Sequence, residues 1–205
     1  MDENKKKMLE GKIYDPFIGD LQQERINCHN LCLEYNQLTD LHPRKDEIIK
    51  ILFPDSENLY LQGPIFFDFG TNTHFGKNCY ANFNFSVLDI CPIHIGDNVF
   101  FGPNVALMNA VHPFLPEERN SYFDKEKGYI TDMEYAKPIN IGSDCWIAAN
   151  VVIIGGVTIG EGCVIGAGSV VTRDIPPHSF ACGNPCRVKR KITKEDSIYL
   201  KKELW

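Results

Sequence analysis

The sequence predicts a mainly β protein, a parallel β-helix of six-residue repeats with a small helical cap at its N-terminus. The first observation is an aliphatic residue that recurs at every sixth position over much of the C-terminal half. The second is the glycine or alanine that follows most of these positions. The third is a pair of short amphipathic segments near the N-terminus, which contain neither glycine nor proline.

Residues 1–55 are expected to form the helical cap. Residues 24–38 carry apolar side chains at helix-like spacing. Residues 44–53 follow His42-Pro43, and proline favours the first turn of a helix. Both segments are too short to be stable alone, so we expect them to pack against a larger β region.

Residues 56–190 are expected to form the β-helix, and residues 191–205 a C-terminal tail. The most regular block is Ile141, Ile147, Ile153, Ile159, Ile165 and Val171; earlier blocks are Ile95, Phe101 and Leu107, and Phe69, Phe75, Ala81 and Val87. A six-residue period is typical of a parallel β-helix, in which each hexapeptide forms a short strand and a turn. An α-helix would repeat at three and four positions, and a β-sandwich at two. The repeated aliphatic side chains should therefore point into the coil.

Composition excludes several classes of protein. The chain has 205 residues and a formal net charge of −6, which argues against a general nucleic-acid binder. Its N-terminus is charged, unlike a secretory signal. Its longest strongly apolar stretch, residues 151–160, is far short of the roughly 20 residues of a membrane span. We therefore expect a cytoplasmic protein.

The eight cysteines are expected to be thiols. No Cys-x-x-Cys pair occurs, and a cytoplasmic location argues against disulfides. Four cysteines share the fifth position of the repeat, where a compact side chain is needed: Cys79, Cys91, Cys145 and Cys163. Free cysteine behaves there as a small hydrophobic residue, so these positions do not indicate a zinc site.

The six-residue period stops after Leu107 and resumes at Ile141. The gap contains an inserted loop of about residues 113–137, and loops of this length in compact proteins are usually functional or disordered. His112 lies at the root of the loop, where a rigid scaffold can hold it while it reaches solvent. Neutral imidazole suits a general base. A structural or surface role for His112 is an equally open interpretation.

At this point the sequence resembles a known family, the hexapeptide-repeat O-acetyltransferases that act on sugars, and within it the maltose and galactoside branch. The motifs that carry the resemblance are MLEGKIYDP (8–16), the stretch 78–105, the His112-Pro113 pair, the stretch 138–160, IGAGSVVTRDIPPHS (165–179) and GNPCRVKRKI (183–192). They span nearly the whole chain and include the N-terminal cap typical of this branch.

The resemblance implies a left-handed β-helix that assembles as a homotrimer, with active sites between subunits. It implies acetyl transfer from acetyl-CoA to a hydroxyl of a maltose, glucose or galactoside type of sugar, without a metal. His112 matches the catalytic histidine, the general base for direct attack of the acceptor hydroxyl on the thioester. No acetylated enzyme is required, and the cap lies on the acceptor side.

The resemblance also implies binding residues. Six residues match positions near the acceptor: Asn82, Asp15, Arg25, Asp68, Tyr80 and Asp89. Eight match positions along the CoA groove: Trp146, Ala148, Ala149, Ala167, Thr172, Arg173, Arg187 and Arg190. The run 187–194 has no acidic residue, and CoA phosphates give a physical reason for such a basic island in an acidic chain.

One departure from the family and three alternatives stay open. The inserted loop has extra residues around 122–132, which leaves the sugar undetermined. The same chemistry could act on an antibiotic or other xenobiotic. A γ-type carbonic anhydrase shares the coil but needs a second zinc-binding histidine five residues after the first, and position 117 is Glu. The last alternative is a non-catalytic scaffold.

Overall fold

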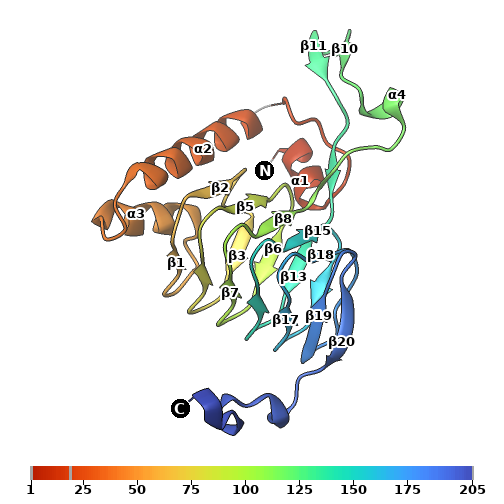
Figure 1. The fold of residues 1–205 in the computed structure, drawn as a ribbon. Coiled ribbons are helices and arrows are strands. Elements are labelled where there is room, and N and C mark those ends of the chain that lie inside the picture. Colours follow the sequence, from red (N-terminus) through yellow and green to blue (C-terminus); the bar gives the residue numbers. More distant parts are fainter. Residues whose placement is uncertain (1, 19, 205) are drawn as a thin grey trace.

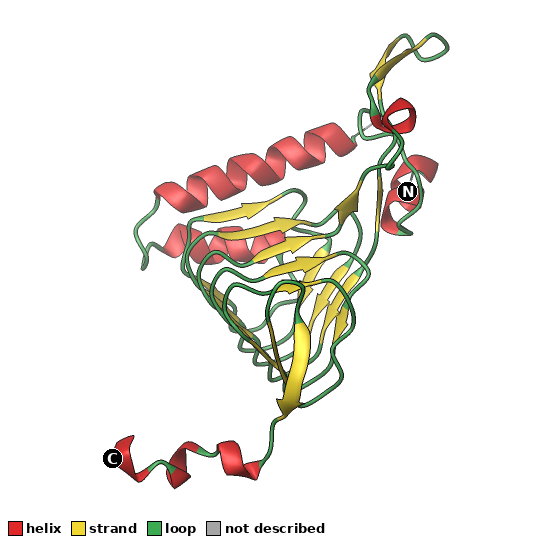
Figure 2. Ribbon diagram, turned by 45° about the vertical axis from the view of Figure 1, so that its right-hand side comes forward, coloured by secondary structure: helices red, strands yellow, loops and turns green. Residues whose placement is uncertain are grey.

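The computed structural model describes residues 2–18 and 20–204, and it has the predicted architecture of a parallel β-helix with a helical cap. Three parallel sheets form the sides of a stack of coils with a triangular outline (Figure 2). Helix α2 (Leu21–Gln37) runs across the N-terminal coils, and α3 (Pro43–Leu52) lies beside them (Figure 1).

Each of the first four turns of the coil contributes one strand to each sheet. The first sheet contains β1 (Tyr60–Leu61), β4 (Tyr80–Ala81), β7 (Phe100–Phe101), β14 (Trp146–Ile147), β17 (Val164–Ile165), β19 (Ser179–Cys182) and β20 (Arg187–Lys191). The second contains β2 (Ile65–Phe67), β5 (Phe85–Leu88), β8 (Ala106–Met108), β15 (Val152–Ile154) and β18 (Val170–Val171). The third contains β3 (Thr73–Phe75), β6 (Ile93–Ile95), β13 (Ile139–Ile141) and β16 (Thr158–Ile159). All neighbouring strands in these sheets are parallel, except β20, which runs antiparallel to β19.

The coil continues in register across the insertion. Phe100 pairs with Tyr80 in the coil before it and with Trp146 in the coil after it. Ile153 likewise pairs with Leu107. The inserted residues therefore leave the stack at one corner and return to it without disturbing the β pairing.

The repeated aliphatic residues form the core, as the period predicted. Ile147, Ile153, Ile159 and Ile165 have no exposed surface. Phe69 is an exception, because it packs with Met8, Tyr14 and other residues of the cap in a separate cluster. The corner that follows Val87 also breaks the period, since the next residue of the repeat, Ile95, comes eight positions after Val87, and Ile93 before it is buried in the same core.

Asparagine ladders hold two corners of the coil. Residues with positive φ stack at these corners: Asn58, Asn78, Asn98 and Asp144 at one, and Asn84, Asn104 and Asn150 at the other. Each asparagine side chain donates to the next residue of its ladder, and the Asn98 Nδ2–Asp144 Oδ1 distance is 2.9 Å. Asparagine tolerates this left-handed backbone better than most residues, and its amide bonds the coils together.

Glycines that follow core residues lie where two coils touch. A Cβ on Gly102 would come within 2.6 Å of the Ala149 backbone nitrogen, and one on Gly96 within 2.5 Å of the Ser143 nitrogen. A methyl group fits at neither position. This contact explains the small residue of the repeat.

The cap contains the two predicted helices and one that was not predicted, α1 (Glu3–Leu9). Pro43 occupies the first turn of α3, and His42 caps that helix by accepting from the Arg44 amide. The hydroxyl of Tyr35 on α2 donates to the Leu61 carbonyl and so ties the cap to the coil. All eight cysteines are free thiols, and seven of them are buried.

The insertion lies between β9 (Ala110–Val111) and β12 (Tyr135–Ala136), which pair antiparallel. It contains the short helix α4 (Pro116–Arg119) and a hairpin of β10 (Tyr122–Asp124) and β11 (Tyr129–Thr131) that projects away from the coil (Figure 1). After β20 the chain ends in short 3₁₀ turns at 194–196, 198–200 and 202–204. In the described part of the chain, no helix combines the length and apolar character that a membrane crossing requires.

Candidate active site

His112 lies at the root of the insertion, directly after β9, and its side chain is half exposed. The β9–β12 pairing places Val111 opposite Tyr135, so that His112 lies beside Glu134. The distance from His112 Nε2 to Glu134 Oε1 is 4.0 Å.

Glu134 is held from its other side by Tyr14 of the cap. The Tyr14 hydroxyl donates to Glu134 Oε2 at 2.6 Å, and both side chains are buried. Burial raises the pKa of Glu134, while the Tyr14 hydrogen bond and the charge of His112 act in the opposite direction. Burial and the neighbouring carboxylate raise the pKa of Tyr14, so Tyr14 stays a hydrogen-bond donor.

Two of the expected acceptor residues gather near this group. The charge of Asp68 raises the pKa of both Tyr14 and Glu134, and Arg25 acts on Tyr14 in the opposite direction. Asp68 Oδ1 lies 3.1 Å from Nε2 of His29 on α2. Asp68 and His29 line a pocket of about 220 Å³ between α2 and the outer side of the second sheet.

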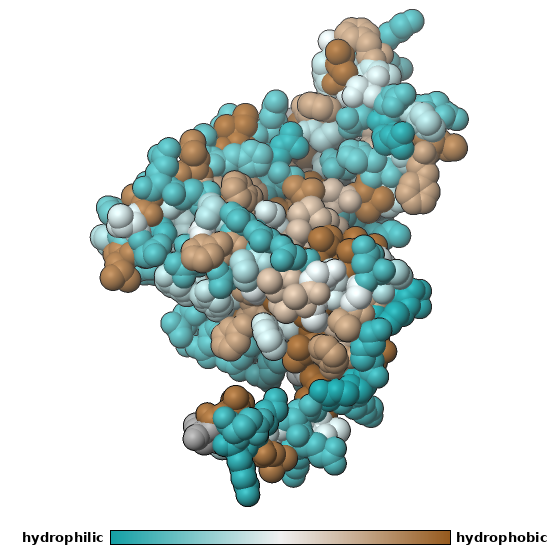
Figure 3. All heavy atoms as spheres, viewed as in Figure 1, coloured by the Kyte–Doolittle hydropathy of each residue, from teal (hydrophilic) through white to brown (hydrophobic). Residues whose placement is uncertain are grey.

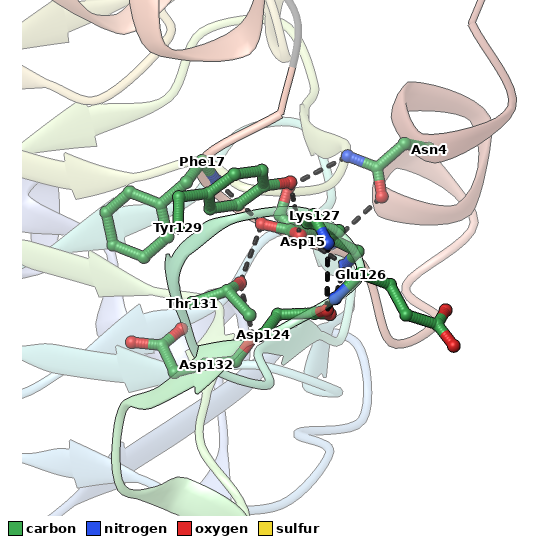
Figure 4. Close-up of polar contacts among 9 residues, drawn as sticks. All are labelled: Asn4, Asp15, Phe17, Asp124, Glu126, Lys127, Tyr129, Thr131 and Asp132. Atoms are coloured by element: carbon green, nitrogen blue, oxygen red, sulfur yellow. Dashed lines mark hydrogen bonds and ion pairs between the residues drawn. The ribbon is translucent and has the colours of Figure 1, made fainter.

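Asp15, another expected acceptor residue, already has a full set of partners (Figure 4). Its Oδ1 accepts from the Phe17 amide at 3.0 Å and the Thr131 hydroxyl at 2.8 Å. Its Oδ2 accepts from Lys127 Nζ at 2.6 Å and the Tyr129 hydroxyl at 3.0 Å. Burial acts to raise the pKa of Asp15, but the Lys127 contact and the other hydrogen bonds hold it below its ordinary value.

Asp89, a further expected acceptor residue, has no exposed surface. Its carboxylate accepts from the Phe69 amide at 2.8 Å and from the Thr73 hydroxyl at 3.0 Å. Burial raises the pKa of Asp89 to about 7, despite these hydrogen bonds. The geometry supports a structural role, in which the carboxylate holds a corner of the coil closed.

Tyr80 and Asn82 lie in a second place, on the outer side of the first sheet. They line a groove of about 450 Å³ together with Phe100, Trp146 and Ala149. The structure thus brings two expected acceptor residues next to two expected CoA residues. Aromatic rings form one wall, and the Tyr80 ring stacks on that of Tyr60 at 6.0 Å.

These two groups lie at opposite ends of the second sheet within one chain. Asn82 lies at the corner between the first and second sheets, where its amide donates to the Phe101 carbonyl. His112 follows β9, past the other end of the second sheet. At about 3.3 Å per residue, the sheet separates the two residues by roughly 20 Å.

The remaining expected CoA residues extend over two corners and the C-terminal strands. Ala148 and Ala149 stack below residues 166–168 of the next coil, where Ala167 lies. Thr172 and Arg173 follow β18 and are exposed at the far end of the second sheet. Arg187 donates to the Cys186 carbonyl, and Arg190 forms a two-bond ion pair with Asp196 at 2.6 and 2.7 Å.

Sequence reasoning did not find Glu134 or Tyr14. They are 120 positions apart, and neither belongs to a repeat, so no spacing links them. The one available signal was for Glu134, which lies close to the point at which the insertion returns to the coil. Within residues 2–18 and 20–204, no three His, Cys, Asp or Glu side chains are placed to hold a metal ion.

Comparisons with known proteins give a consistent result. Residues 138–173 match the model of the bacterial transferase hexapeptide (six repeats), and residues 7–56 match the maltose acetyltransferase hexapeptide capping motif. The chain is 39% identical to the galactoside O-acetyltransferase of Escherichia coli over 198 residues, 94% of this chain and 91% of that protein.

Solved structures agree. A maltose O-acetyltransferase from Clostridium difficile 630 is 40% identical with a TM-score of 0.83, and the match covers 93% of this chain and 98% of that one. A galactoside acetyltransferase in complex with coenzyme A is 37% identical with a TM-score of 0.84, over 96% of this chain and 94% of that one.

Proposed function

This chain belongs to the hexapeptide-repeat acetyltransferase family that contains the galactoside and maltose O-acetyltransferases, and we propose that it transfers the acetyl group of acetyl-CoA to a sugar hydroxyl. The observation that carries the proposal is the His112–Glu134–Tyr14 group at the root of the insertion. His112 is half exposed to solvent, whereas Glu134 and Tyr14 are buried. This arrangement suits a general base.

The reaction is a direct transfer. The free imidazole nitrogen of His112 takes the proton of the acceptor hydroxyl as its oxygen attacks the thioester carbonyl. The tetrahedral intermediate collapses, the carbon–sulfur bond breaks, and the CoA sulfur leaves with the proton that His112 returns. Atoms and charge balance without an acetylated enzyme.

Glu134 stabilises the positive charge that His112 carries midway through this reaction. The carboxylate is buried, so its field at the imidazole is weakly screened. The Tyr14 hydrogen bond fixes the carboxylate, which limits its reorganisation when the charge forms. Glu134 and Tyr14 thus stabilise the imidazolium form of His112, as a buried acid does in other sites with a catalytic histidine.

The acceptor is proposed to bind between two copies of the chain in a homotrimer. Arg25 and Asp68 of one copy lie near Tyr14, while Tyr80 and Asn82 belong to the groove that a second copy would offer. Such amides, carboxylates and hydroxyls suit the directed hydrogen bonds of a sugar. Asn82 and His112 then contact one ligand from opposite subunits.

Apolar side chains on the outside of the coil support this assembly. Six of them point outward from the first and second sheets: Tyr60, Phe66, Leu88, Phe100, Trp146 and Ile154. The third sheet presents polar residues outward, such as His74, His94 and Asn140. Hydrophobic side chains are visible on the surface over the coil in Figure 3. Exposed apolar patches of this kind mark interfaces.

Acetyl-CoA is proposed to lie along the groove that Trp146, Ala149 and Ala167 border, with its phosphates near basic residues. Arg173 is exposed and available for such contacts, and Arg187, which donates to the Cys186 carbonyl, is partly exposed. Arg190 is already paired with Asp196, so it serves CoA only if that ion pair opens.

An acceptor screen tests the proposal. The purified protein is incubated with acetyl-CoA and single sugars, namely maltose, glucose, a galactoside and an unrelated polyol, and the released thiol is measured. We expect thiol release that depends on at least one sugar, together with an acetylated sugar detected by mass. Release that no sugar stimulates contradicts the proposal.

A further inference from the structure

Asn109 is a fully buried asparagine at the point where the chain leaves the coil and enters the insertion. Its side-chain amide group donates to the Cys91 carbonyl at 2.6 Å, and its side-chain oxygen accepts from the Ile90 amide at 2.9 Å. Both partners belong to the long corner that follows β5 in the coil before. Buried polar groups need such partners, so this corner fixes the position of Asn109.

Asn109 lies in a column of equivalent residues, one from each of three coils. The pairing of β8 with β5 and with β15 puts Asp89, Asn109 and Gly155 at matching positions, just after their strands. Asp89 reaches back to the coil before it in the same way, since its carboxylate accepts from the Phe69 amide. A Cβ on Gly155 would lie 3.0 Å from the Asn109 carbonyl oxygen, so the next coil packs closely on the backbone of Asn109. Asn109 is therefore held between two coils.

The insertion also returns to the coil at Asn109. The Lys137 amide donates to the Asn109 carbonyl at 3.1 Å, next to the antiparallel pairing of β9 with β12. His112 lies three positions after Asn109, and Glu134 lies three positions before Lys137. The two segments form a short ribbon of residues 109–112 and 134–137. Asn109 is at the inner end of this ribbon, and the His112–Glu134 pair is at its outer end.

The ribbon has few other attachments to the coil. Its strands β9 and β12 pair over two residues each, and both residues of β9 are only partly buried. Tyr14 binds Glu134 at the outer end of the ribbon, but Tyr14 belongs to the cap. A two-stranded ribbon is at best marginally stable alone. Its direction therefore depends on how its inner end is fixed to the coil.

We propose that Asn109 is a positioning residue for the reaction, and that its side chain anchors the ribbon to the coil and so sets the place of His112 relative to the two substrates. This inference rests on the proposed function for the role of His112. Asn109 acts through His112 and touches neither substrate. Because a displacement of about 1 Å can slow a catalysed reaction up to about a hundredfold, loss of the anchor is measurable in kcat.

Steady-state kinetics test the anchor. Asn109→Ala removes both side-chain hydrogen bonds and should lower kcat about tenfold, while the KM values for acetyl-CoA and the sugar change by less than about twofold. Asn109→Asp keeps an acceptor for the Ile90 amide and loses the donor to Cys91. If Asn109→Ala does not fold, Asn109→Asp takes its place, with the same expectation of a lower kcat at unchanged KM.

Asn72→Ala is the matched control. The Asn72 side chain is also buried and binds the same corner from the opposite coil, with its amide nitrogen 2.8 Å from the Asp89 carbonyl oxygen. Its loss should lower the free energy of unfolding, as in Asn109→Ala, but leave kcat within about twofold of the wild type. Equal losses of kcat in the two variants would overturn the inference, and so would a wild-type kcat in a folded Asn109 variant.

The His112→Ala background separates positioning from general damage to the site. If Asn109 acts only through His112, Asn109→Ala lowers the residual kcat of His112→Ala by less than about twofold, because no base is left to misplace. A tenfold loss in both backgrounds contradicts the inference.

Hydrogen exchange reports on the anchor without reference to activity. Amides of residues 110–111 and 135–137 should exchange faster in Asn109→Ala, and at the wild-type rate in Asn72→Ala. Unchanged exchange of these amides in a folded Asn109 variant contradicts the inference. Failure of the proposed function would appear instead in the wild-type protein, as an absence of acetyl transfer to any sugar.

Discussion

At the scale of single residues, the proposed role of His112 as a general base depends on neighbours that lie far from it in the sequence. Glu134 lies 22 positions later and Tyr14 almost a hundred positions earlier. The position of His112 at a break in the repeat was predictable, since the six-residue period stops after Leu107 and resumes at Ile141. The partners were not, because their meeting depends on how an insertion without periodicity folds against the cap.

Glu134→Gln keeps the shape of the side chain and removes its charge. We expect kcat to fall about tenfold to a hundredfold, since the imidazolium loses its stabilising partner. Tyr14→Phe, which removes only the hydrogen bond, should cause a smaller loss of the same kind. Glu126→Gln, on the exposed hairpin, is the matched control for loss of one negative charge. A wild-type kcat for Glu134→Gln would refute the role given to this residue.

Asp89 makes the stability of the fold depend on pH. Burial raises its pKa from 3.8 in the ordinary state to about 7 in the folded chain, so the folded protein holds a proton that the unfolded chain has lost. The free energy of unfolding that Asp89 contributes is therefore fully present at low pH. It declines as the pH rises toward 7, by at most about 1.4 kcal/mol per pH unit.

The Asp89→Asn variant has no proton to lose. Its amide oxygen can still accept from the Phe69 amide, and its NH₂ group can donate to Thr73. Denaturant titrations at about pH 5 and about pH 7.5 should show a smaller decline of unfolding free energy in the variant than in the wild type. Equal declines would show that this carboxyl does not titrate in the range given.

At the scale of elements, the coil was predictable and its corners were not. A six-residue spacing of aliphatic residues follows directly from a strand and turn of fixed length, so the strands could be placed in advance. The longer corner after Val87 and the stacked asparagines depend on contacts between coils. Helix α1 escaped prediction because it has only one buried residue, Met8.

The resemblance to the family assigned acceptor and CoA residues by their place in the motifs, without information on the contacts of their side chains. Asn82, Tyr80 and Trp146 share one groove, and the strand that contains Phe100 lies between those of Tyr80 and Trp146 in the same sheet. Asp89 and Asp15 were placed at the acceptor by sequence matching alone. Their carboxylates accept hydrogen bonds at a corner of the coil and from the hairpin, and a residue type in a motif does not reveal which partners its side chain meets.

Gly102→Ala tests the packing between coils. Its Cβ would lie 2.6 Å from the backbone nitrogen of Ala149, which cannot move without breaking the strand pairing. We expect a loss of about 1–3 kcal/mol in unfolding free energy, as for other overpacked sites. Gly128→Ala, with nothing within 4 Å of the new Cβ, carries only the strain of its positive φ and should cost about 1 kcal/mol. Equal losses would indicate that contact between coils is not what demands glycine.

At the scale of the whole molecule, the proposed function combines His112 of one subunit with Asn82 of another in a homotrimer. His112→Ala and Asn82→Ala subunits should each be inactive as pure proteins. When the two are co-expressed in equal amounts and mix at random, about one in four of the sites between subunits is intact, so about a quarter of the wild-type activity should return. Activity that stays absent in the mixture, while sedimentation confirms mixed trimers, would place both residues in one subunit's site.

The most direct test of the account is the activity of the His112→Ala variant with acetyl-CoA and the sugar that the wild type accepts best. We predict that kcat falls by a factor of about a thousand or more, because direct transfer has no other base. Acetyl-CoA should still bind with near wild-type affinity in a calorimetric titration, since His112 lies outside the CoA groove. A variant that binds acetyl-CoA and still transfers the acetyl group at the wild-type rate would contradict the account.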